Sequence, residues 1–469
     1  MELVSKTDPF WTDEHQRRQS DTTSLVFGKI RKSIWDAFDA GDSLFEGATK
    51  EVCIILARRN LETIYAYLGA LRSGVVPLFV NGESDSQSLE KLIKDYSPRY
   101  IFASEAITDS TYEPINSVGD ARLYETKQAK SARIFHDLAI LQPTSGSTGD
   151  SKCVRVSYEN LNFVSRAITS YLELTPDRTL ITTLPLHYTF GLSIVHSAIH
   201  SGADLILAED SITSANFWQL FTNNRVTDFS GVPFQFQMLS KRGFPSAVLE
   251  TLQCVSQAGG ALSPGEVSWW LDYCEPRGIK FFVMYGQTEA SPRISYLPPS
   301  LARQKIGSVG IPIPGGKLQV QNPNSEGIGE LVYSGPNVCM GYAESFEDLS
   351  LGDELGGILH TGDIGRADSE GIVYITGRSK RFVKLAGISV GMDSLESSIR
   401  ENLEREVAVV GQDDGLVIVI AGNPDEGLRA LALGDLGVSP NLVKVEFIDE
   451  IPRLETGKID YQQLKSIYV

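Results

Sequence analysis

Residues 141–156 contain a run of small and hydroxyl-bearing side chains that suits the binding of phosphate groups. An apolar segment leads into Pro143, and Lys152 follows the run. Glycine lets backbone N–H groups approach a polyphosphate closely, while hydroxyl groups and a lysine ammonium add further donors. The residues predicted to contact phosphate are Thr144, Ser145, Gly146, Ser147, Thr148 and Lys152.

Two other interpretations apply to the same stretch. Ser, Thr and Gly are ordinary loop residues, so a plain loop between two strands is one alternative. A Walker A loop is the other, and it requires a lysine followed by Ser or Thr and then a helix. Here Cys153 follows Lys152, and the alternation of Val154 and Val156 indicates a strand. The sequence therefore excludes the Walker A loop.

Composition excludes several classes of protein. The chain has 469 residues, 42% of them hydrophobic, and a formal net charge of −17. A non-specific nucleic-acid binder needs a basic face, so we expect no nucleic-acid partner. The five cysteines are scattered without a C-x-x-C pair, which favours reduced thiols over zinc ligands or disulfides. No leader-like or membrane-spanning apolar run is present, so we expect a cytoplasmic protein without a membrane partner.

The elements that must position the phosphate-binding residues alternate between strand and helix. Apolar runs predict strands at 52–56, 75–80, 100–102, 180–184, 205–207, 254–256 and 281–284. Helical patterns occupy 61–73, 88–94 and 217–223, while Ser157 and Ser263 are predicted to cap two further helices. This alternation predicts a parallel sheet covered by helices on both faces. Within 1–50, the spacing of Leu25, Ile30, Ile34 and Phe38 predicts helices.

The predicted pattern of secondary structure changes twice toward the C-terminus. From Ile306, short strands separated by turn residues predict a small β-subdomain, with a long polar loop reaching Gly357. Beyond Ser379 the pattern is that of a compact α+β unit, in which Asp393 and Glu396 are predicted to form a capping box. The predicted fold is α/β. A large N-terminal domain (1–378) of mixed sheets flanked by helices, with the β-subdomain, precedes a small C-terminal domain (379–469).

Five stretches match one family in order and spacing. They are TSGSTGDSK at 144–152, QAGGA at 257–261, YGQTE at 285–289, HTGD at 360–363 with ITGRSKRFVKLAG at 375–387, and PRLETGK at 452–458. With them the chain resembles the adenylate-forming superfamily of acyl-CoA synthetases, peptide-synthetase adenylation domains and luciferases. The resemblance implies that ATP and Mg²⁺ convert a small carboxylic acid into an acyl-adenylate with release of pyrophosphate. It also implies transfer of the acyl group to a thiol, either coenzyme A or the phosphopantetheine arm of a separate carrier protein.

The same resemblance assigns roles to individual residues. Those implied to hold the nucleotide are Gly259, Gly260 and Ala261 beside the adenine, Tyr285 on its ring with the adjacent Gly286, and Asp363 and Arg378 at the ribose. Thr288 would contact the α-phosphate, and Glu289 would hold Mg²⁺, a hard cation that prefers oxygen ligands. Lys458, next to the Gly457 turn, would reach both the acid and the α-phosphate as the main catalytic residue.

A moving C-terminal domain is part of the implied mechanism. Lys380 occupies the position at which members of the family hinge, so the small domain would be mobile. Its rotation would carry Lys458 away and bring residues 386–388 to the site for thioester formation. Two departures from the family pattern, Ser151 for a proline and Cys153 for a glycine, predict a stiffer or shifted phosphate loop.

Residues 184–192 resemble the segment that lines the acyl pocket of the family. The predicted pocket residues are His187, Tyr188, Phe234 and Met238. Relatives that activate amino acids usually carry an aspartate in this segment to pair with the ammonium group, and none is present here. This absence disfavours an α-amino acid, although a carboxylate elsewhere could replace it.

Three alternatives to an acid–thiol ligase are kept. The first is amino-acid adenylation for a carrier protein. It is distinguished by whether amino acids or plain carboxylic acids support the reaction with ATP. The second is a scaffold that binds nucleotide without catalysis and would show no activity to lose when Lys458 is replaced. A luciferase-type oxygenase is a distant third, because it needs a special substrate that the sequence does not reveal.

Overall fold

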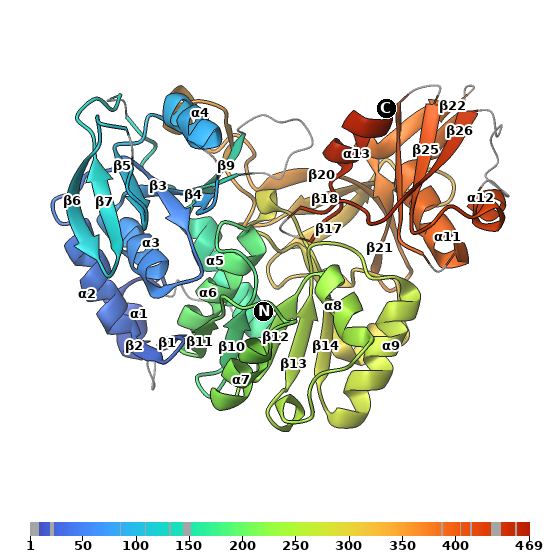
Figure 1. Ribbon diagram of the computed structural model, residues 1–469, viewed down its shortest axis with the longest axis horizontal. Coiled ribbons are helices and arrows are strands. Elements are labelled where there is room, and N and C mark those ends of the chain that lie inside the picture. The colour runs from blue at the N-terminus through green and yellow to red at the C-terminus, as the bar shows by residue number, and fades with distance from the viewer. Residues whose placement is uncertain are drawn as a thin grey trace.

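The structure of the protein is a computed structural model (Figure 1). It describes residues 9–18, 23–84, 86–107, 109–130, 133–143, 152–385, 388–403, 405–412, 415–432, 442–454 and 457–469. The described part of the chain folds into two large sheets, a small sheet beside them, and a C-terminal unit that lies at the right of Figure 1.

The eight-stranded sheet of the described chain carries the strands that flank the predicted phosphate loop. Its order is β19 (Gly341–Ala343), β9 (Cys153–Ser157), β8 (Leu138–Pro143), β4 (Val76–Asn81), β3 (Val52–Ala57), β5 (Tyr100–Ala103), β7 (Ala121–Glu125) and β6 (Glu113–Val118). The strands β8 and β9 are antiparallel, and Pro143 pairs with Cys153 across the loop. The predicted strands on either side of the phosphate loop are thereby confirmed.

The nine-stranded sheet of the described chain lies in the middle of Figure 1. Its order is β16 (Ile311–Pro312), β15 (Ser295–Leu297), β14 (Lys280–Tyr285), β13 (Cys254–Gln257), β12 (Asp228–Gly231), β10 (Thr179–Thr182), β11 (Asp204–Leu207), β1 (Ser24–Phe27) and β2 (Ile30–Ser33). The strands β12, β13 and β14 are parallel. Because the carboxyl ends of parallel strands share one edge, the loops after them meet there, and these loops include Gly259 and Thr288.

Helices separate and cover the two large sheets. One hydrophobic core joins α2 (Ile34–Leu44), α3 (Leu61–Ser73), α5 (Tyr158–Leu172) and α6 (Thr189–Ser201) to strands of both sheets. On the other face of the nine-stranded sheet, a second core contains residues of α7 (Ala215–Asn223), α8 (Pro233–Ser240) and α9 (Pro264–Cys274). A third core packs α4 (Ser86–Tyr96) on the outer face of the eight-stranded sheet. The result is a layered α/β architecture, as predicted.

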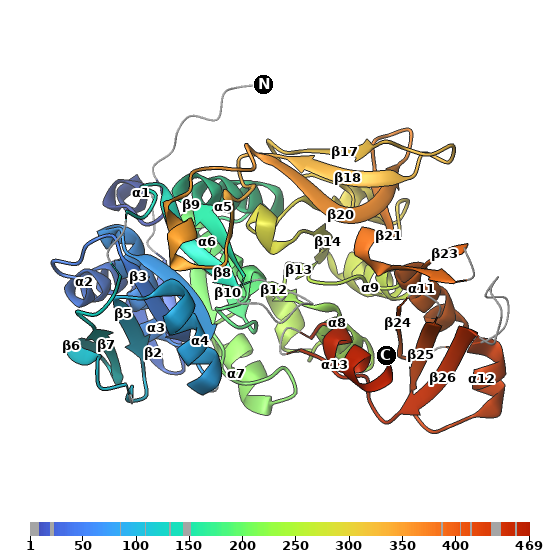
Figure 2. The same cartoon turned by 90° about the horizontal axis from the view of Figure 1, so that it is seen from above.

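The small β-subdomain and the C-terminal unit complete the described chain (Figure 2). The subdomain is an antiparallel sheet of β17 (Lys317–Gln321), β18 (Gly329–Ser334), β20 (Ile358–Ala367) and β21 (Val373–Arg378). The C-terminal unit contains β22 (Phe382–Leu385), β23 (Ile388–Gly391), α11 (Met392–Leu403), β24 (Val407–Gln412), β25 (Gly415–Ala421), α12 (Glu426–Ala432), β26 (Val443–Ile448) and α13 (Tyr461–Tyr468). Its three-stranded sheet has a core on each face.

Helix caps explain why several predictions held. Ser157 accepts a hydrogen bond from the Asn160 amide at the start of α5, and Ser263 accepts one from Glu266 at the start of α9. Such caps satisfy backbone donors that the first helical turn leaves unpaired. The helix predicted at 61–73 ends at Gly74, whose φ of 79° is the left-handed conformation that terminates helices.

Three predictions were wrong. Leu25 and Ile30 lie in the antiparallel strands β1 and β2, because β1 pairs with the distant strand β11 and this tertiary pairing overrides the local helical spacing. The loop predicted before Gly357 contains β19, which pairs with β9. Asp393 lies inside α11, which begins at Met392, so it is not the cap of that helix.

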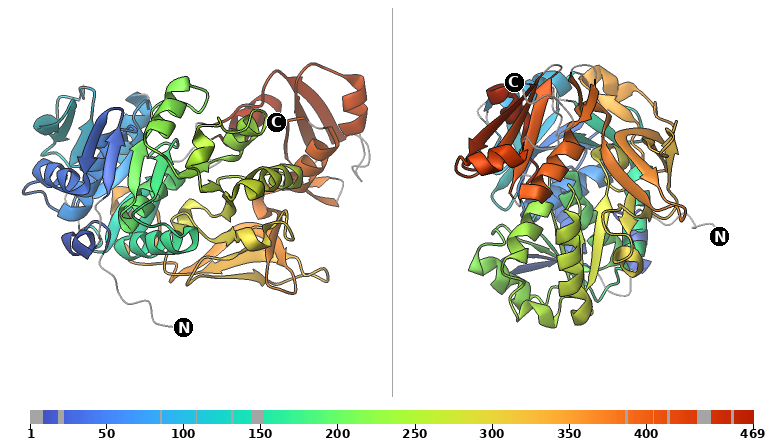
Figure 3. Two further views of the ribbon diagram at one scale, coloured as in Figure 1. Left: turned by 90° about the horizontal axis from the view of Figure 1, so that it is seen from below. Right: turned by 90° about the vertical axis from the view of Figure 1, so that its right-hand side faces the viewer.

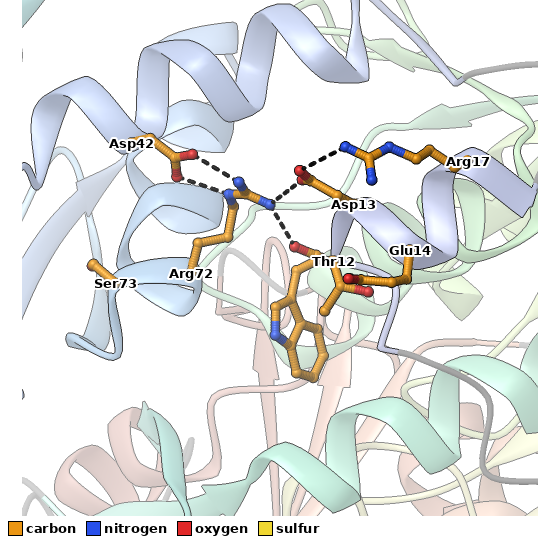
Figure 4. A pocket seen from close by; sticks show the side chains of 8 residues that line it. Thr12, Asp13, Glu14, Arg17, Asp42, Arg72 and Ser73 are labelled. Carbon is orange, nitrogen blue, oxygen red and sulfur yellow. Dashed lines mark hydrogen bonds and ion pairs between the residues drawn. The ribbon is translucent and has the colours of Figure 1, made fainter.

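The N-terminal helix is held by a network of charged residues (Figure 4). Arg72 of α3 lies 2.7 Å from Asp42 of α2 and 3.0 Å from Asp13 of α1 (Asp13–Arg18). Arg17 lies 3.6 Å from Asp13. The network ties the helices α1, α2 and α3 together. Of the helices in the described ranges, none combines the length and the apolar character that crossing a bilayer requires.

Candidate active site

Lys458 of the C-terminal unit meets residues of the larger unit. Its Nζ lies 5.6 Å from the centre of the Tyr188 ring, and the side chain is half-buried. Burial and, to a smaller extent, the nearby Arg378 guanidinium lower the pKa of Lys458 to about 8, while Glu289 and Asp363 oppose the change. Three charged residues that the sequence assigned to nucleotide or metal binding thus lie within electrostatic reach of Lys458.

The turn that carries Lys458 fits closely against α8. Gly457 has a φ of 77°, and a Cβ added to it would lie 3.0 Å from Val232 Cγ2. The Arg453 guanidinium donates a hydrogen bond of 2.8 Å to the Gly457 carbonyl and lies 5.0 Å from the centre of the Phe234 ring. A glycine is required here both by backbone conformation and by space.

Asp363 is a buried carboxylate that joins two other predicted nucleotide residues. Arg378 Nε donates a hydrogen bond of 2.9 Å to Asp363 Oδ1, and the Tyr285 hydroxyl donates one to Oδ2. Only 4% of the Asp363 side chain is exposed, whereas 63% of Arg378 is. Burial and the adjacent carboxylate raise the pKa of Tyr285, so its hydroxyl stays protonated and able to donate. The carboxylate is held in one orientation, with lone pairs left for other donors.

Glu289 and Lys152 lie beside the same tyrosine. The Tyr342 hydroxyl donates a hydrogen bond of 3.0 Å to Glu289 Oε1, and Lys152 Nζ lies 3.7 Å from the centre of the Tyr342 ring. Lys152 also lies 3.7 Å from Glu344. Thr288, at the start of a 3₁₀ turn (Thr288–Ala290), shares a hydrogen bond of 3.2 Å with Thr189. Tyr342 of β19 is a residue that sequence reasoning missed.

The donor set around Glu289 fits Mg²⁺. Within the ranges that the structure describes, no three His, Cys, Asp or Glu side chains gather to hold a metal by themselves. Mg²⁺ is usually held by one or two carboxylates together with substrate phosphates and water. Among the described residues, only Tyr342 is hydrogen-bonded to the Glu289 side chain, and it engages Oε1, so Oε2 is available for such an ion.

The glycine segments after β13 and β14 are shaped by their neighbours. Gly259 has a φ of 86°, and an added Cβ would lie 2.6 Å from the Tyr188 hydroxyl. Gly260 accepts a hydrogen bond of 2.6 Å from Gln257 Nε2, and Ala261 is exposed. At Gly286 an added Cβ would lie 1.8 Å from the Pro292 carbonyl, so the chain accepts only glycine there. These positions leave backbone rather than side chains facing the site.

The predicted acyl-pocket residues lie in different surroundings. Tyr188 is partly buried against the same core as Tyr285, and His187 is half-buried. Phe234 is 39% exposed and lies at the contact with the C-terminal unit, beside Gly457. Met238, one turn further along α8, packs against the second core. The structure therefore brings Tyr188 and Phe234 toward the Lys458 turn, and gives Met238 a packing contact instead.

Another residue near Tyr188 was missed by sequence reasoning. Arg293 lies between the 3₁₀ turn and β15, and its guanidinium is 4.4 Å from the centre of the Phe190 ring. Its charge opposes the effect of burial, which raises the pKa of Tyr188 to about 12. The signal in the sequence was an arginine in an otherwise small and apolar run (290–294) four residues after Glu289.

Some predicted residues cannot be compared with the structure. Thr144, Ser145, Gly146, Ser147 and Thr148 lie outside the described residues, as do 386 and 387 of the segment implied in thioester formation. The backbone of Lys380 lies in a 3₁₀ turn (Ser379–Arg381) that links β21 to β22. Their predicted roles stay predictions.

Comparison with known proteins identifies the class. The family model described as AMP-binding enzyme matches residues 39–343, well over half of the chain. The chain therefore belongs to the family of AMP-binding enzymes. The adenylate-forming superfamily predicted from the five motifs is confirmed.

Individual relatives cover most of the chain. A 2-succinylbenzoate–CoA ligase from Geobacillus sp. (strain WCH70) is 27% identical over 452 residues, which cover 90% of this chain and 88% of the relative. An indoleacetate–CoA ligase from Aromatoleum aromaticum is 29% identical over 344 residues, covering 69% and 66%. Among solved structures, the o-succinylbenzoate CoA synthetase from Bacillus subtilis, in complex with its acyl-adenylate intermediate, has a TM-score of 0.75 at 21% identity and covers 98% of both chains. The last similarity confirms the predicted fold class.

Proposed function

We propose that the protein is an AMP-forming acid–CoA ligase, which activates a small carboxylic acid with ATP and transfers the acyl group to coenzyme A. The observation that carries this proposal is the position of Lys458, which lies beside Tyr188 and within electrostatic reach of Glu289 and Asp363. Both curated relatives described above are named as CoA ligases. The alternative acceptor, a carrier-protein phosphopantetheine, has no such support.

The first half-reaction joins two anions. A carboxylate oxygen of the acid attacks the α-phosphorus of ATP, the bond from that phosphorus to the β-bridging oxygen breaks, and pyrophosphate leaves. Catalysis must bring the anions together and supply positive charge where negative charge accumulates. The Lys458 ammonium would lie between the carboxylate and the α-phosphate. Bound Mg²⁺ would neutralise phosphate charge, and Glu289 is the residue that would hold it.

The second half-reaction needs a different arrangement of the same cleft. The thiolate of coenzyme A attacks the acyl carbonyl carbon, the bond to the AMP oxygen breaks, and AMP leaves. The thiol proton passes to solvent. Because Lys458 is seated against α8 in this structure, we propose that the C-terminal unit rotates about Lys380 to let the thiol enter.

Contacts on either side of Lys380 support a boundary between residues 378 and 379. The Arg378 side chain binds Asp363 of the larger unit. The Arg381 guanidinium instead lies 2.6 Å from Asp393 and 3.2 Å from Glu396 of α11, and 3.7 Å from the centre of the Tyr461 ring. Two arginines three residues apart are thus anchored in different units, so a rotation of the backbone between them would break neither anchor. Figure 3 shows the C-terminal unit beside the small β-subdomain.

The substrate that we propose carries an aromatic ring. Tyr188, beside Lys458, and Tyr285 are partly buried aromatic residues and leave aromatic surface on this side of the site. Aromatic side chains favour flat apolar groups through stacked and edge-to-face contacts. The two curated relatives are named for 2-succinylbenzoate and indoleacetate, which both contain a ring.

Pyrophosphate release tests the proposal. The purified protein is incubated with ATP, Mg²⁺ and a panel of aryl, alkyl and amino acids, with and without coenzyme A. We expect acid-dependent pyrophosphate release with aryl acids, and formation of the acyl-CoA thioester when coenzyme A is present. Turnover of amino acids alone would favour adenylation for a carrier protein, which a phosphopantetheinylated carrier would then reveal. ATP binding without turnover of any acid would favour a non-catalytic scaffold.

A further inference from the structure

One aromatic side chain, that of Tyr342, contacts two residues from different parts of the predicted site. Its hydroxyl donates a hydrogen bond of 3.0 Å to Glu289 Oε1. Lys152 Nζ lies 3.7 Å from the centre of the same ring, which is within the range of a cation–π contact. Glu289 is the residue implied to hold Mg²⁺, and Lys152 is predicted to contact phosphate. Tyr342 thus joins the two predicted positions through two separate parts of its side chain.

The backbone of Tyr342 is held by a buried arginine. Tyr342 lies in β19 opposite Val154 of β9, and Arg155 Nε donates a hydrogen bond of 2.9 Å to the Tyr342 carbonyl. The Arg155 side chain is fully buried, and its Nη2 lies 2.5 Å from Glu354 Oε2. Hydrogen bonds from a guanidinium are charge-assisted and therefore stronger than those between neutral groups. The ring of Tyr342 thus extends from a backbone whose position is set by buried contacts.

The main chain also joins Glu289 to the segment that carries Tyr342. The Cys339 amide donates a hydrogen bond of 2.9 Å to the Glu289 carbonyl. Gly341 has a φ of 128°, and an added Cβ would lie 2.8 Å from Arg155 Nη2. Glycine at this position therefore allows β19 to approach the arginine that holds it. Main-chain and side-chain contacts together give Tyr342 and Glu289 a defined relation.

We propose that Tyr342 is a positioning residue for the part of the site that binds metal and phosphate. This inference rests on the proposed function. The hydroxyl holds Glu289 so that Oε2 is available to Mg²⁺, and the ring holds the Lys152 ammonium for contact with phosphate. Glutamate and lysine side chains are long and flexible, so holding them in advance removes part of the entropy that ligand binding would otherwise cost. Hydrogen-bond partners of metal-binding carboxylates typically contribute about 10- to 100-fold to metal affinity.

Calorimetric titration tests the two contacts separately. The dissociation constant for ATP is measured without metal and again with saturating Mg²⁺, and the ratio of the two reports the contribution of the metal to binding. Tyr342→Phe removes only the hydroxyl, so we expect this ratio to fall about 10-fold while metal-free binding changes by less than about two-fold. Tyr342→Leu also removes the ring, so we expect metal-free ATP binding to weaken about three-fold in addition.

Tyr374 of β21 provides a matched control. Its ring is partly buried, and the Arg366 guanidinium lies 4.7 Å from the ring centre, but neither residue belongs to the predicted site. Tyr374→Phe and Tyr374→Leu should change either dissociation constant by less than about two-fold.

A double-mutant cycle tests whether the hydroxyl acts through the carboxylate. Glu289→Gln removes the charge implied to hold the metal, so it should itself lower the ratio. Adding Tyr342→Phe to this variant should lower the ratio by less than about a further two-fold, because the two groups act as one unit. Thioester formation from supplied acyl-adenylate uses no ATP, so it should change by less than about two-fold in Tyr342→Phe.

A purely structural role would give a different pattern. Equal weakening of ATP binding with and without Mg²⁺ in Tyr342→Phe, or additive losses in the double variant, would overturn the inference. If Tyr342→Leu does not fold, as judged by thermal unfolding without ligand, Tyr342→Phe and the cycle decide the question.

The binding measurements need no acid substrate, so they are independent of the test of the proposed function. A contribution of Mg²⁺ that depends on Tyr342, in a protein that turns over no acid, would support the inference and contradict the proposed ligase activity. Acid-dependent pyrophosphate release, with an unchanged contribution of Mg²⁺ in Tyr342→Phe, would do the reverse.

Discussion

The titration of Lys458 makes the first half-reaction sensitive to pH in a defined direction. Burial and the neighbouring Arg378 lower its pKa from 10.5 to about 8, against the opposing effect of Glu289 and Asp363. At about 1.4 kcal/mol per pH unit, this difference means that burial destabilises the protonated form of Lys458 by roughly 3 kcal/mol. Above pH 8 the free enzyme loses the positive charge, so adenylate formation should fall as pH rises.

Bound substrates should reverse part of this effect. The carboxylate of the acid and the phosphates of ATP are anions next to the ammonium, and an adjacent opposite charge raises the pKa of a lysine. The pH profile of kcat/KM reports the free enzyme, whereas that of kcat reports the enzyme–substrate complex. We therefore expect kcat/KM for ATP to decline above about pH 8, and kcat to decline only at a pH at least about one unit higher.

The assay is pyrophosphate release measured from about pH 6.5 to about pH 10 at low and at saturating ATP. Lys458→Arg stays charged throughout this range and should lose the decline in both profiles. Lys458→Met should be slower by about 100- to 1,000-fold, without a basic decline, while still binding ATP. Persistence of the decline near pH 8 in either variant would refute the assignment to Lys458. A decline of the wild-type rate near pH 10 would refute the conclusion that burial lowers the pKa of Lys458.

The remaining predictions concern the ribose site, the Lys458 turn and the core. Asp363→Asn removes the negative charge that Arg378 binds, so the dissociation constant for ATP, measured by calorimetry, should rise about 10- to 100-fold. Gly457→Ala introduces strain of roughly 1 kcal/mol at a φ of 77°, so pyrophosphate release should slow about five-fold. Thioester formation from supplied acyl-adenylate should stay unchanged. Equal slowing of both steps would contradict the proposal that Lys458 occupies this position only in the first half-reaction. Burial lowers the pKa of His196 to about 3, so below pH 6.5 this histidine is protonated in the unfolded chain but not in the folded one. The free energy of unfolding therefore falls by up to about 1.4 kcal/mol per pH unit as the pH falls. His196→Gln should accordingly show a smaller drop in the midpoint of thermal unfolding between about pH 7 and about pH 5 than the wild-type protein.

Local signals were sufficient for much of the fold. The capped starts at Ser157 and Ser263 and the helix end at Gly74 depend on residues a few positions apart, so the sequence displays both partners of each interaction. Apolar runs likewise predicted the central strands, because a strand of a parallel sheet is buried on both faces. The order of five motifs predicted the superfamily, which the family match confirmed.

Pairings between distant segments were decided by the tertiary structure. The spacing around Leu25 predicted a helix, but β1 instead pairs with β11, some 180 residues away in the sequence. Tyr342 was read as part of a polar loop, and only the pairing of β19 with β9 brings it to Glu289 and Lys152. Such long-range partners are invisible to local patterns of hydrophobicity and propensity.

The chain itself thus determined which chemical groups are present and the order in which they occur, because motif spacing and helix caps are local properties. Only the folded molecule decided that Lys458 lies beside Tyr188, that Asp363 holds Arg378 and Tyr285, and that Arg293 is buried against the Phe190 ring. The physical reason is that burial and charge pairing depend on neighbours in space. These neighbours determine whether an ordinary lysine becomes a group with altered protonation.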